Sequence, residues 1–352
     1  MIKKSFLFVV CLYAVFAFAE EYNFYMISDP HFGAAETFVT DPKVPRRYRT
    51  KKDIHRSDKV MPLYKILFAD IQKKSDSKTR FVIEAGDLVE GGTHNEATHR
   101  KVLSDAISLM KQYFKFPIYM VKGNHDAFGF GGEKAWKDVA LKQIAEYLNT
   151  DRLAFSNYSV KSGKDLFIFM DFYPKAKGFE FVRKTLANLK EKPRYLFVIL
   201  HCPMIFTYQF QQEAPVLCEL LSEYNGILLA GHCHHNTVAK FEKNGKSMRQ
   251  VTVSTFIPPW PLHRLRMEDS GISLEQEKQK FKEKLKIRKV ESFLPVFEKK
   301  WEPFVTEYRD IKGVGYARFD VSDKGITVSF QSVDTSQKPL VIQLLTGKNK
   351  ER

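Results

Sequence analysis

Short apolar runs alternate with longer amphipathic segments through residues 22–255, and this alternation restricts the fold more than any other feature. Each run is rich in β-branched or aromatic residues and is bounded by Asp, Gly, His or Pro, which is typical of buried strands. Strand–helix alternation predicts an α/β fold with helices outside the sheets. We expect strands at 23–28, 80–84, 118–121, 166–170, 195–200 and 227–230, and helices at 59–74, 96–114, 133–148, 179–190 and 213–224.

The pattern changes near residue 255. Just before it, Asn244-Gly245 between two apolar runs is typical of a hairpin turn. After Pro258-Pro259-Trp260-Pro261, residues 273–293 are rich in Glu, Lys and Gln and predict an exposed charged helix, and residues 315–332 predict a final hairpin. We therefore expect one main domain over 20–260 and a helix-and-hairpin extension over 261–352 that packs on the same domain.

Several of the expected strands end in residue types that bind metal ions. Because the carboxyl ends of strands are where ligands gather in α/β sheets, we expect these side chains at one rim. Carboxylate oxygen and imidazole nitrogen together suit Mn, Fe, Zn or Co. The strand ends are Asp29-Pro30-His31, Gly86-Asp87, Gly123-Asn124-His125-Asp126, His201 and Gly231-His232-Cys233-His234.

The spacing of these residues indicates how they share metal ions. Alternate residues of an extended segment point the same way, so Asp29 and His31 can bind one ion, and so can His232 and His234. The Asp87 carboxylate can bridge two ions. The glycines before Asp87, Asn124 and His232 are expected to let the backbone turn sharply behind each ligand.

In this order, the blocks resemble the calcineurin-like metallophosphoesterase family, and the resemblance covers about residues 22–255. It implies a four-layer α/β/β/α sandwich of two mixed β-sheets flanked by helices. It also implies two divalent or mixed-valence metal ions, of unknown identity among Mn, Fe, Zn and Co. The first would be held by Asp29, His31, Asp87 and His234, and the second by Asp87, Asn124, His201 and His232.

The resemblance also implies catalytic roles for His125 and Asp126. His125 would lie near the leaving oxygen as a general acid, and Asp126 would orient its ring. Purple acid phosphatases, one branch of the family, have a tyrosine three residues after the bridging aspartate, whereas this chain has Glu90 there. A tyrosinate–iron centre is therefore not expected.

The implied activity is hydrolysis of a phosphomonoester or phosphodiester by a hydroxide that bridges the two ions. A nucleotide or cyclic-nucleotide phosphodiesterase, or a nuclease, is an alternative within enzymes. A non-catalytic binding module on the same fold is the alternative outside them. Such a module would be expected to lack several ligands, and this sequence retains the whole set.

The charge balance favours anionic partners, since 56 Lys and Arg against 41 Asp and Glu give a net charge of +15. We expect a phosphate-ester substrate, with nucleotides among the candidates, and no stable nucleic-acid complex. The charge leaves open a weak contact with an anionic membrane surface. Arg46, Arg47 and Tyr48, in an aperiodic stretch over 32–59, and Phe128 are candidate substrate contacts; the alternatives are a solvated basic loop and simple packing of Phe128.

The first residues predict export. Lys3 and Lys4 precede an apolar run over 6–18, and Ala17-Phe18-Ala19 suits a signal peptidase, so we expect a signal peptide over 1–19. The run is shorter than the roughly 20 residues that a membrane span needs. The expected location is secreted or periplasmic, or the endoplasmic reticulum and extracellular space in a eukaryote. Beyond the leader, Cys202, Cys218 and Cys233 are too few for a disulfide framework. We expect Cys202 and Cys233 to be buried free thiols; the alternatives are a disulfide between them or an approach to the metal ions.

Overall fold

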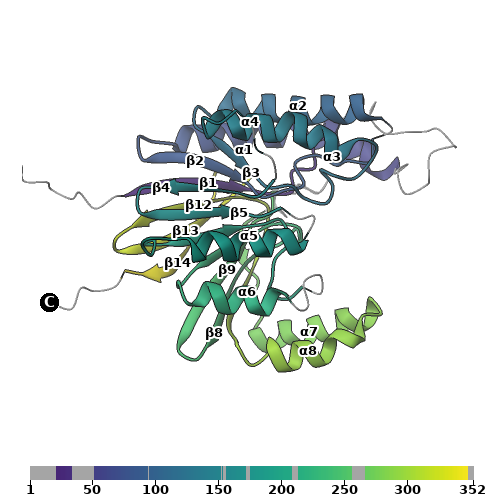
Figure 1. Ribbon diagram of the computed structural model, residues 1–352. Coiled ribbons are helices and arrows are strands. Elements are labelled where there is room, and N and C mark those ends of the chain that lie inside the picture. Colours follow the sequence, from purple (N-terminus) through teal and green to yellow (C-terminus); the bar gives the residue numbers. More distant parts are fainter. Residues whose placement is uncertain are drawn as a thin grey trace, which may run out of the picture.

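Two β-sheets lie face to face, and helices cover their outer faces (Figure 1). The computed structural model describes residues 21–33, 51–93, 95–151, 153, 156–171, 175–207, 213–255 and 266–347. The expected signal peptide and the candidate contacts Arg46, Arg47 and Tyr48 lie outside these residues. None of the helices in the described ranges is long and apolar enough to cross a membrane.

The six-stranded sheet joins strands from the two ends of the chain. Its central strand β1 runs parallel to β2 and antiparallel to β12, so the sheet is mixed. The order across it is β14 (Leu340–Thr346), β13 (Gly325–Ser332), β12 (Gly315–Ser322), β1 (Tyr22–Ile27), β2 (Thr79–Glu84) and β3 (Ile118–Met120).

The eight-stranded sheet is mixed as well. Four adjacent strands run parallel to one another: β5, β6, β7 and β9. They are flanked by antiparallel strands, β4 beside β5 and β8 beside β9. The order is β10 (Glu268–Asp269), β11 (Val305–Lys312), β8 (Asn236–Lys243), β9 (Lys246–Thr252), β7 (Ile227–Ala230), β6 (Leu196–Ile199), β5 (Asp165–Phe169) and β4 (Tyr158–Ser162). The two mixed sheets confirm the predicted α/β/β/α sandwich.

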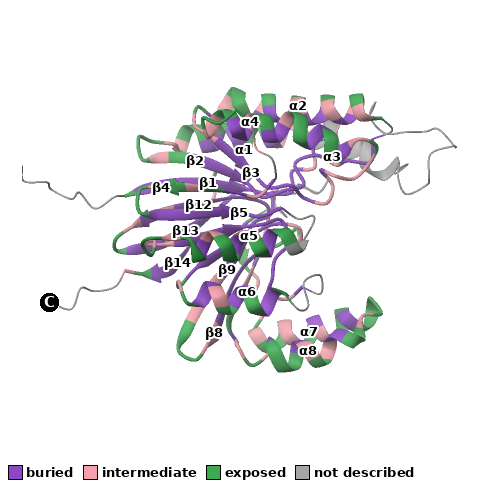
Figure 2. Ribbon diagram, viewed as in Figure 1, coloured by how far each residue is buried: buried purple, intermediate pink, exposed green. Residues whose placement is uncertain are grey.

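Helices on each outer face complete the four layers. The six-stranded sheet carries α1 (Lys51–Lys74), α2 (Glu96–Tyr113), the short α3 (Gly132–Ala135), a π-helical turn at Trp136–Ala140 and α4 (Leu141–Tyr147). The eight-stranded sheet carries α5 (Lys175–Ala187), α6 (Glu213–Ser222), α7 (Leu274–Ile287), a 3₁₀ turn at Glu291–Phe293 and α8 (Leu294–Lys300). Figure 2 shows that the central strands between these layers are almost entirely buried.

Aromatic side chains fill the space between the sheets. Phe24 on β1 stacks on Phe81 and Phe319 of its own sheet, and it meets Phe167 and Phe197 of the other sheet edge-on at 5.4 and 5.5 Å. On β5, Phe167 and Phe169 face this inter-sheet core, whereas the alternate residues Leu166 and Ile168 face the outer helices. Burial of both faces explains why these strands appear as continuous apolar runs in the sequence.

The structure corrects two expectations about helices. Residues 51–59 were expected in an aperiodic stretch but form the first turns of α1, which continues through Pro62. The charged segment over 273–293 was expected to be one exposed helix. It is α7 followed by a 3₁₀ turn, and the apolar residues Phe281, Leu285 and Phe293 bury its inner side against the eight-stranded sheet.

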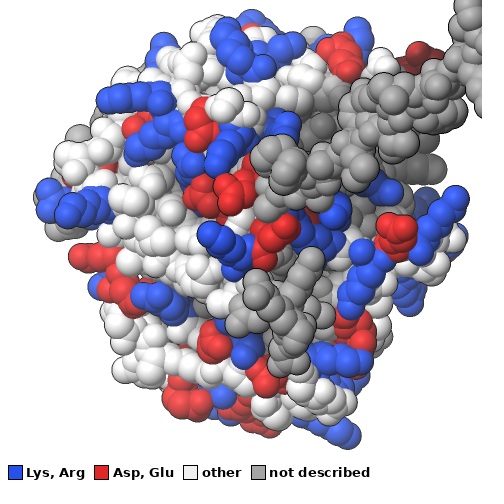
Figure 3. All heavy atoms as spheres, turned by 90° about the vertical axis from the view of Figure 1, so that its left-hand side faces the viewer, with Lys and Arg blue, Asp and Glu red and all other residues white. Residues whose placement is uncertain are grey.

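The charged surface is mixed in sign on the face drawn in Figure 3. Lys and Arg side chains are spread over this face among Asp and Glu side chains. Ion pairs between exposed residues, such as Lys101 with Asp105 at 2.5 Å, are typical of such a surface and stabilise it little. On this face, the excess of basic residues therefore does not form one continuous patch.

Candidate metal centre

The metal-ligand residues meet at one rim, where β1, β2, β3, β6 and β7 end. Strands of both sheets contribute, because Asp29 and His31 follow β1 and Asp87 follows β2, while His201 follows β6 and His232 follows β7. Chain segments more than 200 residues apart therefore supply adjacent ligands, since His232 N–H donates to Asp29. This confirms the expectation that the strand ends converge.

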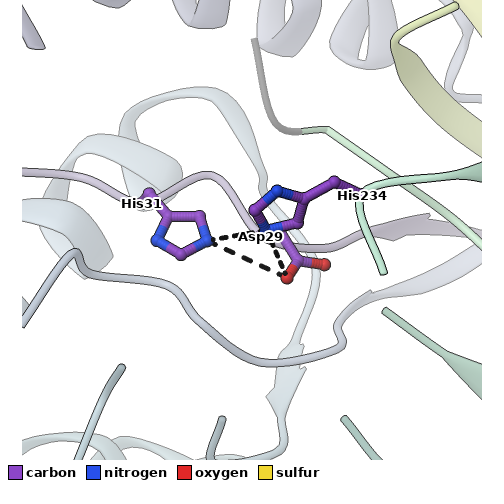
Figure 4. A group of neighbouring side chains, drawn as sticks. All are labelled: Asp29, His31 and His234. Carbon is purple, nitrogen blue, oxygen red and sulfur yellow. Dashed lines mark hydrogen bonds and ion pairs between the residues drawn. The ribbon is translucent and has the colours of Figure 1, made fainter. Parts of the chain in front are cut away.

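The first group of possible ligands is Asp29, His31 and His234 (Figure 4). The Nε2 atoms of His31 and His234 lie 3.9 and 3.4 Å from Oδ1 of Asp29. These two ring nitrogens are 3.1 Å apart. Three donor atoms thus point at one small volume, as a metal ion requires.

The second group is Asp87, His201 and His232. Nε2 of His201 lies 3.0 Å from Oδ2 of Asp87 and 3.2 Å from Nδ1 of His232. His201 is fully buried, and its other nitrogen Nδ1 donates to the carbonyl of Ala85 at 2.9 Å. That bond leaves Nε2 as the nitrogen able to bind a metal ion.

The two groups adjoin one another through Asp87. Its Oδ2 atom, besides meeting His201, lies 3.8 Å from Nε2 of His31 in the first group. Asn124 supplies a further oxygen, because its Oδ1 atom is buried and has no hydrogen-bond partner among the described residues. A buried amide oxygen without a partner is costly unless something binds it. The donor set and this oxygen fit a pair of cations.

Five of these residues have left-handed backbone conformations, which non-glycine residues rarely adopt. The φ values are 58° at Asp29, 50° at His31, 57° at Asp87, 68° at His232 and 54° at His234. The segments are therefore tight turns, and the argument from alternation along an extended strand was wrong. It grouped Asp29 with His31 correctly, but it also grouped His232 with His234, which the structure assigns to different groups. Strain of this kind is typical of functional sites.

The glycines of the motifs act mainly through their small size. Only Gly86 among the three has a positive φ, at 96°. A Cβ atom on Gly231 would lie 1.7 Å from Oγ of Ser28 and 2.4 Å from Oδ2 of Asp29. The absence of a side chain lets the β7 loop approach the β1 loop, so that His232 N–H can donate to Asp29. Of the three glycines, only Gly86 thus adopts a conformation that favours glycine.

Electrostatic coupling favours the ionised form of the Asp87 carboxylate. Burial alone would raise the pKa of the Asp87 carboxyl, but the neighbouring His201 holds it far below its usual range. Burial would lower the pKa of His201, and Asp87 instead raises it to about 9. Burial, assisted by the charge of His201, lowers the pKa of His232 to about 4. The neighbouring carboxylates thus favour a second proton on His201, at Nε2, and that proton must leave before Nε2 binds an ion.

His125 lies at the rim of the site, with 32% of its side chain exposed. Its Nδ1 atom donates to the backbone carbonyl of Glu90 at 2.7 Å. The ring also packs edge-on against His31, with ring centroids 4.5 Å apart. Burial would lower the pKa of His125, but the charges of Asp87 and Glu90 raise it.

The expected contact between Asp126 and the ring of His125 is absent from the described hydrogen bonds, and Glu90 orients that ring instead. The carboxylate of Asp126 accepts three backbone N–H groups, from Asp87 at 2.9 Å, Val89 at 3.1 Å and Gly123 at 2.8 Å. It therefore holds the β2 and β3 loops together beneath the ligands. Burial and the nearby Asp87 charge raise the pKa of Asp126 to about 7.

Sequence reasoning missed two supporting residues. The Glu90 carboxylate lies 2.9 Å from Nδ1 of His31, so Glu90 contacts both a ligand and His125. His99 is fully buried and bridges two groups. Its Nδ1 atom lies 3.0 Å from Oγ1 of Thr93, and its Nε2 atom donates to the backbone carbonyl of Asp126 at 2.9 Å. Glu90 was visible in the sequence only as a departure from a tyrosine pattern, and His99 gave no signal.

Phe128 is half-buried near the site, with its ring centroid 6.1 Å from that of His125. Its carbonyl accepts from Gly92 N–H at 2.6 Å, and its ring would meet a Cβ atom on Gly92. These contacts are those of a packed loop residue. Cys202 and Cys218 are buried, Cys233 is half-buried, and all three are free thiols.

The family of the protein follows from the sequence profile that it matches. Residues 22–236 match the profile described as calcineurin-like phosphoesterase, which covers more than half of the chain. The chain belongs to the calcineurin-like phosphoesterase family. No curated protein matches it at a significant level.

Solved structures of the same fold resemble this member of the calcineurin-like phosphoesterase family at low sequence identity. One is described as "GAP50 the anchor in the inner membrane complex of Plasmodium", with 14% identity, a TM-score of 0.52 and coverage of 94% of this chain and 90% of that one. Another is PhoD, with 10% identity, a TM-score of 0.50 and coverage of 92% and 68%. These likenesses support the fold alone.

Proposed function

We propose that this protein is an exported, dinuclear-metal-dependent phosphoesterase that hydrolyses a phosphomonoester or a phosphodiester. The observation that carries the proposal is the pair of adjoining donor groups, with Asp87 between them and the unpartnered oxygen of Asn124 beside them. Export rests on the leader-like sequence over 1–19.

The donor groups suggest how two ions would be held. Asp29, His31 and His234 would hold one ion, His201, His232 and Asn124 the other, and Asp87 would bind both. Two cations bound there would lower the pKa of a water molecule to near neutrality and offset the negative charge of a phosphate. Apart from His234, which is exposed, the ligands are buried or half-buried, so they need little rearrangement to bind.

His125 is suited to protonate the leaving oxygen of the ester. A carbonyl oxygen can only accept a hydrogen bond, so the contact with Glu90 keeps one proton on Nδ1. Nε2 is then the nitrogen that takes and gives the catalytic proton. The charges of Asp87 and Glu90 raise the pKa of His125 and so favour this second proton, and the partly exposed side chain is open to a substrate.

Hydrolysis of chromogenic esters by the purified protein, from Glu20 onward, tests the proposal. The protein is treated with chelator and supplied with Mn, Fe, Zn, Co or Mg, and p-nitrophenyl phosphate and bis-p-nitrophenyl phosphate are compared. We expect turnover of at least one ester that a transition metal restores and that His125→Ala abolishes. The ratio of the hydrolysis rates of the two esters distinguishes a monoesterase from a diesterase. Two bound ions without turnover of any ester tested, nucleotides included, would overturn the proposal in favour of a binding module.

A further inference from the structure

A cavity of about 310 Å³ lies beside the metal centre, against both metal-binding loops of the eight-stranded sheet. Pro203 and Ile205, which follow His201, line one part of it, and Cys233 and His235, which flank His234, line another. Helix α7 forms the opposite wall. The side chain of His235 is 69% exposed, and His235 directly follows His234, a ligand of the first group.

The floor of the cavity holds these loops in place. Oε1 of the buried Gln250 accepts from the backbone N–H groups of Met204 and Ile205, at 2.7 and 2.8 Å. Thr252 donates from Oγ1 to the carbonyl of His235 at 2.8 Å, and its hydroxyl also meets that of Thr237 at 2.7 Å. Because the same side chains fix both loops and floor the cavity, its shape is set together with that of the metal centre.

One wall is aromatic and contains a strained residue. Phe206 has a φ of 58°, which is unusual for a bulky side chain. Its ring packs edge-on against Tyr308, at 5.3 Å between centroids, and against Phe281 of α7, at 5.6 Å. All three residues line the cavity. Backbone strain maintained by such packing is typical of a ligand-binding wall.

The other wall, on α7, carries two lysines and one glutamate. Lys280 and Lys284 lie one turn apart on α7 and both line the cavity, and neither is ion-paired with any residue in the described ranges. Their neighbours Lys278 and Lys282 point elsewhere and are paired with Glu275 and Glu302. Glu277 and Asp310 are the acidic residues of the lining, and Asp310 lies 4.0 Å from His235.

Helix α7 lies beyond residues 22–236, which the family profile matches. The α7 wall is thus supplied by the chain's own C-terminal segment and not by the shared part of the domain. A specificity-determining wall added beside a shared catalytic centre is how one fold serves different substrates.

We propose that this cavity receives the leaving group of the phosphoester, and that Lys280 and Lys284 bind a second anionic group on it. The substrate is then a phosphate ester whose alcohol carries a second phosphate or a carboxylate on a short apolar spacer. The spacer lies against Phe206 and Tyr308. This inference rests on the proposed function, because it takes the reacting phosphate to lie at the metal centre.

Binding of non-hydrolysable phosphonates tests the inference without relying on turnover. Full-length mature protein is loaded with Mn²⁺, freed of excess metal and titrated by calorimetry with alkane-α,ω-bisphosphonates of three, four and six carbons. Alkylphosphonates of the same lengths are titrated in parallel. The monophosphonates report on the metal centre, and the ratio of the two affinities at each length reports on the cavity. We expect the best bisphosphonate to bind at least tenfold more tightly than its monophosphonate.

The double variant Lys280→Gln/Lys284→Gln is expected to reduce this ratio to less than threefold. Lys278→Gln/Lys282→Gln removes the same charge from the same helix and is expected to leave the ratio within twofold of the wild type. Two results would overturn the inference: equal affinity for mono- and bisphosphonates at every length, or an affinity ratio that is unchanged in Lys280→Gln/Lys284→Gln. In either case, monophosphonate binding would still support the metal centre. If the wild type binds no monophosphonate, the proposed function is overturned and this inference with it.

Discussion

The Nδ1 atom of His125 donates a hydrogen bond to the backbone carbonyl of Glu90, 2.7 Å away. This bond determines which nitrogen is available for proton transfer. The Glu90 side chain meanwhile reaches His31, at 2.9 Å, so one residue supports both a metal ligand and the proposed acid. The chemistry of the site therefore depends on Glu90, which with His31 and His125 also forms a third group of possible metal ligands.

Replacement of His125 by alanine is expected to reduce turnover by about 10²- to 10⁴-fold, the usual contribution of a positioned general acid. Metal content should not change, because the ring of His125 is outside both adjoining ligand groups. Elemental analysis and ester hydrolysis on the same preparation check this. A variant with full activity, or one that loses its metals, would contradict the assigned role.

The activity of the wild type is expected to fall as pH rises through the raised pKa of His125, because the acid form is then lost. In Glu90→Gln, the negative charge that helps to raise this pKa is removed, while the backbone carbonyl remains. The alkaline limb of the pH–rate profile should therefore move to lower pH. Metal affinity should also weaken by about 10- to 100-fold, since the charged partner of His31 is lost.

The Glu90→Gln profile is measured at saturating metal so that the two effects separate. A shift to higher pH, or an unchanged profile with unchanged metal affinity, would show that the Glu90 carboxylate has no such role.

Asp87→Ala is expected to lose both ions and nearly all activity, because Oδ2 of Asp87 meets ligands of both groups. His234→Ala should lose mainly the first ion, because His234 belongs to that group alone. Asp105→Ala, on the exposed face of α2, is the matched control and should keep both. Two bound ions in Asp87→Ala, measured by elemental analysis after desalting, would argue against a shared carboxylate.

His99→Leu is expected to cost about 1–3 kcal/mol of stability at pH 8, because Thr93 and the carbonyl of Asp126 each lose a buried partner. Burial lowers the pKa of His99 in the folded protein. The unfolded chain thus binds the proton more readily, and the wild type loses stability as pH falls below about 6.5. His99→Leu lacks this pH-dependent loss, so the difference in the free energy of unfolding between wild type and variant should narrow towards pH 5. Urea unfolding in the presence of chelator measures this difference at each pH. A difference that is larger at pH 5 than at pH 8 would contradict the prediction.

The strands and the clustering of the candidate ligands could be predicted from the sequence because each rests on local signals. A strand buried on both faces, such as Leu196–Ile199, is a continuous apolar run, and Gly-Asn-His-Asp rarely follows such a run by chance. The first turns of α1, residues 51–58, were missed because that stretch shows no apolar periodicity; the expected helix over 59–74 already included Pro62. A proline inside a helix is tolerated at a cost that only tertiary packing can offset.

The supporting contacts could not be predicted, because they depend on loops that meet only in the folded protein. Asp126 was expected to touch its sequence neighbour His125, but its carboxylate is taken by N–H groups of another loop, 37 and 39 residues away. The left-handed conformations of Asp29 and His232 had no sequence signal either, since neither residue is a glycine. Only the approach of the β1 and β7 loops explains them.

The position of β1 between β2 and β12 has a consequence for how the protein matures. Tyr22 is paired with Val321, nearly 300 residues later in the chain. Until β12 has been synthesised, the strand that carries Asp29 and His31 keeps one edge open, and pairing across such a sequence separation is slow. Metal incorporation is therefore expected to be a late event, after the whole chain has left the ribosome, and shortened products should emerge without a working centre.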